Sequence, residues 1–188
     1  MQITPLTNEA KEFYEKIFLT KYKNLVESVN KTPLAILIWG PGNTGGNLYC
    51  KRIDILNALR ESGHAAIFSE EIEKDRPIGD MSTHIKELLQ AIEADFIVII
   101  YGSSGSVAET HDFAKYIRDI GSKMLIFIDE EYQDGYGNRG VLLDLKTLYN
   151  NVSTYKYPDD IKKCYLLRSV QEKVKVLQHA KWLRENVR

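Results

Sequence analysis

Short apolar runs alternate with segments of helical periodicity along most of the chain. Five runs have the composition of β-strands, and the first, third and fourth are continuously apolar, as expected of strands that are covered on both faces. These runs are residues 34–39, 64–68, 96–101, 124–128 and 152–157. The segments between them carry apolar residues at steps of three and four. Strands that alternate with helices predict an α/β fold with a parallel sheet of about five strands in flavodoxin-like (Rossmann-like) order.

Two further helices are predicted at the ends of this pattern. From residue 8 to about residue 30, aromatic and aliphatic side chains recur at helical spacing with Lys and Glu between them, which predicts an amphipathic helix within residues 1–32. A second apolar stripe predicts a helix over residues 168–188. No internal repeat interrupts the chain, so we interpret residues 1–188 as a single domain. The terminal helices are candidates for a homo-oligomer interface.

Two glycine-rich turns follow the first and third predicted strands. The first contains Gly40, Gly42, Asn43 and Gly45, and the second contains Gly102, Ser103, Ser104 and Ser106. In flavodoxin-like order these two strands are neighbours, and their crossovers leave on opposite faces, which opens a crevice at their carboxyl ends. Small residues there let the backbone approach a ligand, and helix N-termini offer donors and partial positive charge. Both turns are therefore predicted to bind a nucleotide or a phosphorylated sugar.

The first turn matches neither of the two common phosphate-binding motifs completely. Gly40 and Gly45 have the spacing of a P-loop, but Gly and Asn follow where that loop needs Lys and Ser or Thr, which argues against an ATPase of this type. The three glycines approximate the dinucleotide-binding pattern instead, and Glu70 stands near the end of the second strand, about where a ribose-binding acid is expected. The alternative is that the glycines only form a tight strand-to-helix turn.

Glu109 stands in the first helical turn that follows the second glycine turn. Cleavage of an N-glycosidic bond builds positive charge on the sugar ring, and a carboxylate can attack the anomeric carbon or stabilise the cation. Glu109 is therefore the candidate catalytic residue. Asp129, at the end of the fourth strand, is a further candidate for binding ribose. The alternatives are that Glu109 only stabilises its helix dipole and that Asp129 is a solvated loop acid.

The sequence Gly-Ser-Ser-Gly-Ser-Val-Ala-Glu at residues 102–109, between a strand and a helix, resembles the corresponding region of the nucleoside 2-deoxyribosyltransferase group. It is also similar to that of the related Toll/interleukin-1 receptor-like NAD-cleaving domains. The resemblance covers the pattern of residues 34–130. It implies a flavodoxin-like sheet, a nucleotide pocket lined by the two glycine turns, and Glu109 as nucleophile or cation stabiliser. The transferases carry an aspartate just ahead of this turn, and Tyr101 stands there in this chain.

Charge and cysteine content limit the expected partners. The chain has 25 Lys and Arg against 26 Asp and Glu, so no overall field would attract nucleic acid or an acidic membrane. No run approaches the roughly 20 apolar residues that span a bilayer. The two cysteines belong to no CxxC or Cys/His cluster, and the chain does not begin with the pattern of a signal peptide. We therefore expect a cytoplasmic protein with reduced thiols.

These observations lead to one main hypothesis and two alternatives. The main hypothesis is a hydrolase or transferase that acts at the N-glycosidic bond of NAD or another nucleotide and requires neither a metal nor a cofactor. The first alternative is a non-catalytic nucleotide sensor whose terminal helices signal to a partner. The second is an oligomeric scaffold in which the glycine turns are structural.

Overall fold

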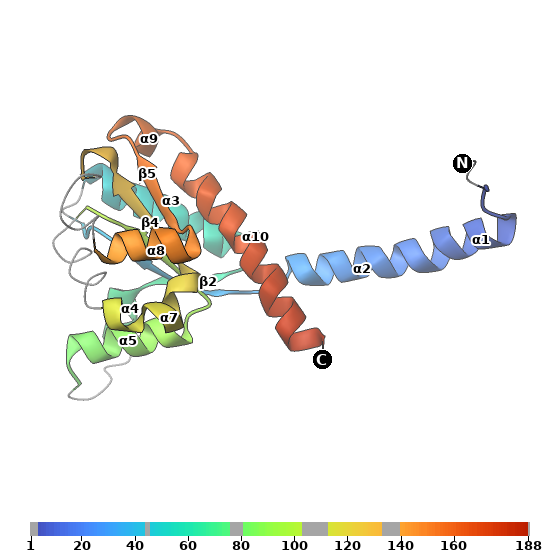
Figure 1. Ribbon diagram of the computed structural model, residues 1–188, viewed down its shortest axis with the longest axis horizontal. Helices are drawn as coiled ribbons and strands as arrows, with labels where there is room; N and C mark the ends of the chain where they lie inside the picture. Colours follow the sequence, from blue (N-terminus) through green and yellow to red (C-terminus); the bar gives the residue numbers. More distant parts are fainter. Residues whose placement is uncertain (1–3, 44–45, 76–80, 103–112, 133–139, 188) are drawn as a thin grey trace. The chain divides into compact units, whose positions relative to one another are not determined.

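The described residues form a five-stranded, all-parallel sheet. The computed structural model describes residues 4–43, 46–75, 81–102, 113–132 and 140–187. The strand order is β2-β1-β3-β4-β5 (Figure 1). The strands are β1 (Ala35–Trp39), β2 (Ala65–Phe68), β3 (Phe96–Ile100), β4 (Met124–Asp129) and β5 (Val152–Tyr155). This order and the parallel pairing of every neighbour confirm the predicted flavodoxin-like α/β fold.

Helices occupy most of the segments between the strands. Those longer than one turn are α1 (Asn8–Phe13), the π-helical η1 (Tyr14–Phe18), α2 (Leu19–Asn30), α3 (Gly46–Glu61), α4 (Ser69–Asp75), α5 (Thr83–Glu93), α8 (Val141–Tyr149) and α10 (Tyr165–Asn186). Short helical turns are η2 (Phe113–Tyr116), α7 (Ile117–Ile120), η3 (Gly121–Lys123), η4 (Glu130–Tyr132) and α9 (Asp159–Lys162). Helix α4 begins directly after β2 and is not among the elements predicted from the sequence.

The strand side chains alternate between two apolar cores. Ile36 and Ile38 belong to the core that α3, α9 and α10 cover, whereas Leu37 and Trp39 belong to the core that α5, α7 and α8 cover. Figure 1 shows α5, α7 and α8 on one side of the strands and α3 on the other. All five residues of β3 are buried. Coverage of both faces explains why the central strands are continuous apolar runs.

The switch in crossover direction lies between β1 and β3. Helix α3, which follows β1, packs on the first core, whereas η2 and α7, which follow β3 in the chain, pack on the second. β1 and β3 pair directly, with Trp39 opposite Ile99 near their carboxyl ends. The two crossovers therefore diverge at this edge, which is the position where open α/β sheets bind ligands.

The chain divides into two compact units. The sheet unit is Pro33–Leu177, and the helical unit combines Met1–Thr32 with Gln178–Arg188. Within the helical unit, the Gln178 amide donates to the backbone oxygens of Asn30 and Thr32 at 2.9 and 3.0 Å. No residue of α1, η1 or α2 is buried. Along the described residues, no helix combines the length and the apolar character that crossing a bilayer needs.

Candidate functional site

A cavity of about 310 Å³ opens at the carboxyl ends of β1 and β2. Its lining residues come from the first glycine turn and from α3, α4 and α5. They are Gly40, Gly42, Arg52, Ser69, Glu70, Thr83, Glu87 and Gln90. This volume is at the lower end of the range of roughly 300 to 1,000 Å³ that is typical of small-molecule sites. The cavity therefore has the size for a ligand such as a nucleoside.

The two glycine turns begin next to each other at this edge. Gly40 has a φ of +153°, a conformation that favours glycine, and an added Cβ would lie 3.1 Å from the backbone oxygen of Ile100 in β3. A Cβ on Gly102 would lie 2.6 Å from Leu48 and 3.4 Å from Pro41 of the first turn. Small residues therefore permit a close approach between the first turn, the end of β3 and the start of the second turn.

Arg52 is the most heavily bonded polar residue of the cavity. The Arg52 side chain is 2% exposed. Its Nη1 and Nη2 atoms each donate to a different carboxylate oxygen of Glu70 at 2.7 Å. Nη2 and Nε also donate to the backbone oxygen of Ile38 at 2.7 and 3.2 Å. The guanidinium carbon lies 4.0 Å from the ring centre of Phe68. Burial of this charge is possible because a carboxylate, a carbonyl and an aromatic face surround it.

The Arg52 pair fixes both the position and the charge of Glu70. Partial burial alone would raise the pKa of the Glu70 carboxyl, but hydrogen bonds and charge from Arg52, with a backbone hydrogen bond, outweigh it and lower that pKa. Glu70 is therefore a carboxylate at neutral pH. Oε2 also accepts a hydrogen bond from the Ser69 hydroxyl at 3.4 Å, so Oε1 is the oxygen with more capacity for another donor. With 46% of its side chain exposed, Glu70 can accept a hydrogen bond from a ligand hydroxyl.

The neighbouring acid, Glu71, has a different set of partners. Its carboxylate accepts hydrogen bonds from Arg60 and from the backbone nitrogen of Phe68, both at 3.0 Å. Glu71 does not line the cavity. Of the two acids that follow β2, only Glu70 is oriented to contact a ligand there.

Gln90 brings an unpaired carboxamide to the cavity wall. Both Nε2 and Oε1 are buried, and neither has a hydrogen-bond partner among the residues that the structure describes. Gln90 also lines a second, mostly apolar cavity of about 320 Å³ that reaches the amino ends of β1 and β2, and a donor and an acceptor bound in either cavity would pair its amide. A nucleobase edge or a pair of sugar hydroxyls has this chemistry.

Trp39 ends β1 next to the first turn, but its ring is part of the core. It stacks on Phe113 at 5.2 Å between centroids, and Phe113 stacks in turn on His84 at 5.5 Å. With 1% of its surface exposed, the Trp39 ring is not available to stack on a ligand base. Its function is to fill the space beneath the carboxyl edge of the sheet.

Asp129 lies at the same edge of the sheet but does not line this cavity. It is 8% exposed, pairs in register with Tyr155 of β5, and accepts a hydrogen bond from the backbone nitrogen of Glu131 at 3.2 Å. Burial and the nearby Asp129 charge raise the pKa of the Tyr155 hydroxyl well above its usual range. Tyr155 is therefore a neutral donor, and it donates to the backbone oxygen of Tyr101 at 3.4 Å.

The structure brings together part of the predicted site. Gly40, Gly42 and Glu70 line one cavity, and Gly102 adjoins the first turn. Asn43 is exposed within the turn and is not part of the lining. The remaining predicted residues, Gly45, Ser103, Ser104, Ser106 and Glu109, lie outside the described residues.

Arg52 and Gln90 are not among the site residues predicted from the sequence. Arg52 carries a detectable signal, because it precedes Ile55, Leu56 and Leu59 by three, four and seven residues and so falls on the apolar face of its helix. A charge on a core-facing stripe indicates a buried ion pair. Gln90 has no such signal, because Gln is common on solvent-facing helix positions.

Neither the protein-family models nor the curated protein sequences contain a match to this chain.

Among the described residues, no group of three or more His, Cys, Asp and Glu side chains could hold a metal ion. The cavity lining supplies two carboxylates, one guanidinium, one carboxamide, two hydroxyls and glycine backbone.

Proposed function

We propose that the chain binds a nucleotide in the cavity at the first glycine turn and cleaves or transfers at its N-glycosidic bond. The observation that carries the binding part is the convergence of Gly42, the oriented Glu70 carboxylate and the unpaired Gln90 amide on one cavity. Glu70 would accept hydrogen bonds from ribose hydroxyls, and Gln90 would pair with a base or a further hydroxyl. The exposed backbone at Gly42 leaves room for a phosphate.

The catalytic part of the proposal rests on the sequence around Glu109. In this reaction the Glu109 carboxylate bonds to the anomeric carbon, or stabilises the cation, as the bond from that carbon to the base nitrogen breaks. The base leaves with the bonding electron pair: nicotinamide from NAD is then neutral, whereas a base such as adenine also takes up a proton. Water or a second base then receives the sugar, which gives hydrolysis in the first case and transfer in the second. NAD and nucleoside monophosphates are the substrate classes that this chemistry suits.

Calorimetry with AMP, NAD and deoxyadenosine monophosphate tests the binding part. We expect saturable binding of at least one of them, and we expect Glu70→Gln to weaken it by about tenfold or more because one hydrogen-bonded charge is lost. Glu71→Gln is the matched control, because Glu71 is adjacent and bonded to Arg60 instead. If no nucleotide binds or raises the melting temperature, the glycine turns are structural and the proposal is wrong.

Chromatographic detection of free base tests the catalytic part separately. We expect wild-type protein to release base from the nucleotide it binds and Glu109→Gln to slow this by about 1,000-fold, with binding retained. Equal turnover by wild type and Glu109→Gln would remove Glu109 from the mechanism. Tight binding with no product after long incubation would favour the nucleotide sensor.

A further inference from the structure

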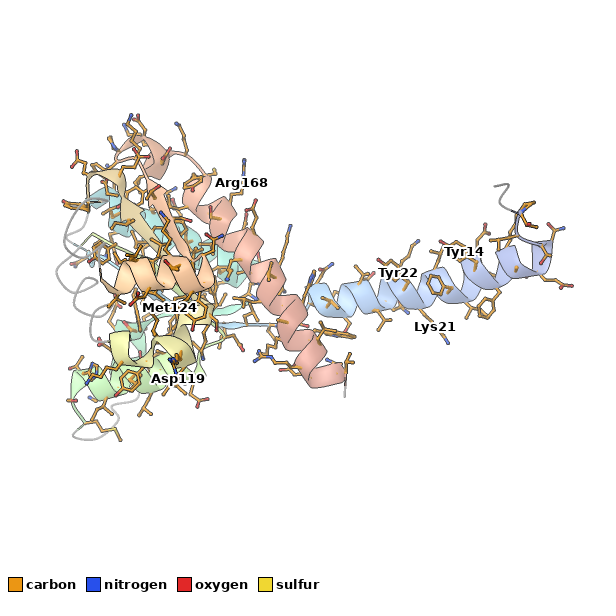
Figure 2. All side chains as sticks on the ribbon, in the orientation of Figure 1. Tyr14, Lys21, Tyr22, Asp119, Met124 and Arg168 are labelled. Atoms are coloured by element: carbon orange, nitrogen blue, oxygen red, sulfur yellow. The ribbon has the colours of Figure 1, made fainter. Side chains whose placement is uncertain are left out.

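The helical unit exposes a long apolar stripe. Helices α1, η1 and α2 follow one another without a break from Asn8 to Asn30, and no residue in this run is buried. The rings of Tyr14, Phe18 and Tyr22 stack along it at 5.5 and 6.3 Å, and Figure 2 shows Tyr14 and Tyr22 projecting from the helix. An amphipathic helix gains most of its stability from packing its apolar face. This stripe therefore needs a partner surface.

An apolar groove lies within the same unit. It has a volume of about 560 Å³ and runs between the second half of α2, at Leu25 and Val29, and the end of α10, at Trp182 and Leu183. The Trp182 indole nitrogen donates to Ser28 at 3.0 Å and fixes this wall of the groove. The helical unit therefore carries both an exposed row of aromatic side chains and an apolar hollow that could receive such side chains.

We propose that a second copy of this chain occupies the groove, with the two N-terminal helices antiparallel. Phe18 cannot fill the groove of its own chain, because it lies seven residues before Leu25 on the same helix, roughly 10 Å away along the axis. In an antiparallel pair, Tyr14 and Phe18 of each copy reach the groove of the other. Both contacts are then identical, which closes the assembly as a two-fold dimer.

The charge distribution favours the antiparallel direction. Residues 8–18 hold three Glu and two Lys, a net charge of −1, whereas residues 19–31 hold three Lys and one Glu, a net charge of +2. The groove end of α10, residues 178–187, adds Lys181, Arg184 and Glu185, a net charge of +1. Antiparallel packing places the acidic start of one helix against the basic groove of its partner, and parallel packing places like charges together.

The exposed apolar surface is large enough for such a dimer. Seven large apolar side chains of the run are between 39% and 60% exposed: Phe13, Tyr14, Ile17, Phe18, Tyr22, Leu25 and Val26. At about 150 to 250 Å² for a fully buried aromatic side chain, these residues can bury on the order of 600 Å² per copy. The groove residues of α10 add to this total. A standard interface buries about 800 Å² per partner, so the surfaces are of comparable size.

Sedimentation velocity with the full chain tests the dimer. We expect wild type to sediment as a species of twice the 21.6 kDa chain mass at about 50 µM, and we expect Phe18→Glu to weaken self-association by about 30-fold or more. Thr20→Glu is the matched control, because it adds the same charge two residues away, about 160° round the helix from Phe18. Circular dichroism establishes whether each variant keeps its helix content.

Pulsed electron paramagnetic resonance tests the direction of packing in a chain that keeps the whole apolar stripe. Spin labels are attached to single cysteines at Lys11 or Thr20, after the exposed Cys50 and Cys164 are replaced by Ser. In an antiparallel dimer the two labels at position 11 lie about 30 Å apart along the axis, and those at position 20, on the outer faces of the two helices, lie about 25 Å apart. A parallel dimer brings the two labels at position 11 to about 10 Å, which broadens the continuous-wave spectrum, and contradicts the proposal.

Three further outcomes would overturn the dimer. The first is a wild-type chain that remains a monomer at about 100 µM, a concentration at which even a weak specific interface associates. The second is equal self-association by Phe18→Glu and Thr20→Glu. The third is a monomer that instead binds vesicles containing about 30% phosphatidylserine, which would make the stripe a lipid-binding surface.

Discussion

The amino and carboxyl ends of the strands differ in how their polar side chains are bonded. At the amino ends, His64, Asp95 and Asn151 are bonded to the backbone: His64 and Asp95 accept from the nitrogens of Leu34 and Ala35, at 3.3 and 2.9 Å. At the carboxyl ends, Gln90 and Trp39 have side-chain atoms with no partner among the described residues. Arg52 is paired there, but its partner Glu70 faces a cavity.

This difference separates groups that stabilise the fold from Glu70 and Gln90, which line the cavity, whereas the unpaired Trp39 nitrogen is buried and does not line it. A buried polar atom without a partner costs stability, so it persists where a function uses it. One acceptor at the amino edge is also unpaired, because Oδ1 of Asn151 has no partner in the described part of the chain. Its Nδ2 nevertheless donates twice, whereas the Gln90 amide makes no hydrogen bond there. We expect mutations at the two edges to have different effects on stability and on binding.

The largest effect is expected for Asn151→Ala at the amino edge. The Asn151 amide donates to the backbone oxygens of Gly121 and Met124 at 2.7 and 3.0 Å, so its loss leaves two buried carbonyls unpaired. We expect the free energy of unfolding, measured in urea, to fall by about 3 kcal/mol. Asn186→Ala, an exposed site, should change it by less than about 0.5 kcal/mol. Equal effects at both sites would contradict the structural assignment of Asn151.

A smaller loss is expected for Glu70→Gln at the carboxyl edge. This change leaves the buried Arg52 charge without a carboxylate, but half-exposure of Glu70 limits the cost to about 2 kcal/mol at pH 7. Because the folded state lowers the pKa of Glu70, the stabilisation is fully present above the ordinary glutamate pKa of 4.5 and is lost as the pH falls through the folded-state pKa. The difference in unfolding free energy between wild type and Glu70→Gln, measured in urea, should therefore be smaller at pH 3 than at pH 7. A larger difference at pH 3 would contradict the ion pair.

A pH-dependent effect is expected from His64. Burial lowers the pKa of its imidazole, and the neutral Nδ1 accepts a hydrogen bond from Leu34. As the pH falls below about 6.5, the unfolded state binds a proton that the folded state does not, so stability decreases towards the folded-state pKa. We expect His64→Gln to remove about 1 kcal/mol of the difference in unfolding free energy between pH 7.5 and pH 5. An equal difference between the two pH values in wild type and His64→Gln would contradict this role of His64.

The smallest effect on stability is expected for Gln90→Leu. Because the Gln90 amide has no partner among the described residues, its replacement by an apolar group of similar shape should leave the unfolding free energy unchanged or raise it by up to about 1 kcal/mol. Nucleotide affinity, measured by calorimetry, should fall by about tenfold because a donor and an acceptor are lost. A clear loss of stability with unchanged nucleotide affinity would mean that Gln90 stabilises the fold and does not bind the ligand. The two edges of the sheet would then not differ in the role of their polar side chains.

The strands could be predicted because burial on both faces demands apolar residues at every position. The predicted bounds differ from the observed ones by two residues at most, as at β5, which ends at Tyr155 instead of residue 157. Helix α4 could not be predicted, because it is only seven residues long and four of them are acidic, with one apolar residue to give a periodicity.

The sequence by itself determined the five strands and the two glycine turns that begin at Gly40 and Gly102, because periodicity and small residues are local properties of the chain. Only the tertiary structure decided that Arg52 pairs with Glu70, 18 residues away, and that Gln90 joins them from α5. These partners depend on how helices from separate crossovers pack against the sheet edge. Packing of this kind is set by the shape of the whole core, and no local pattern records it.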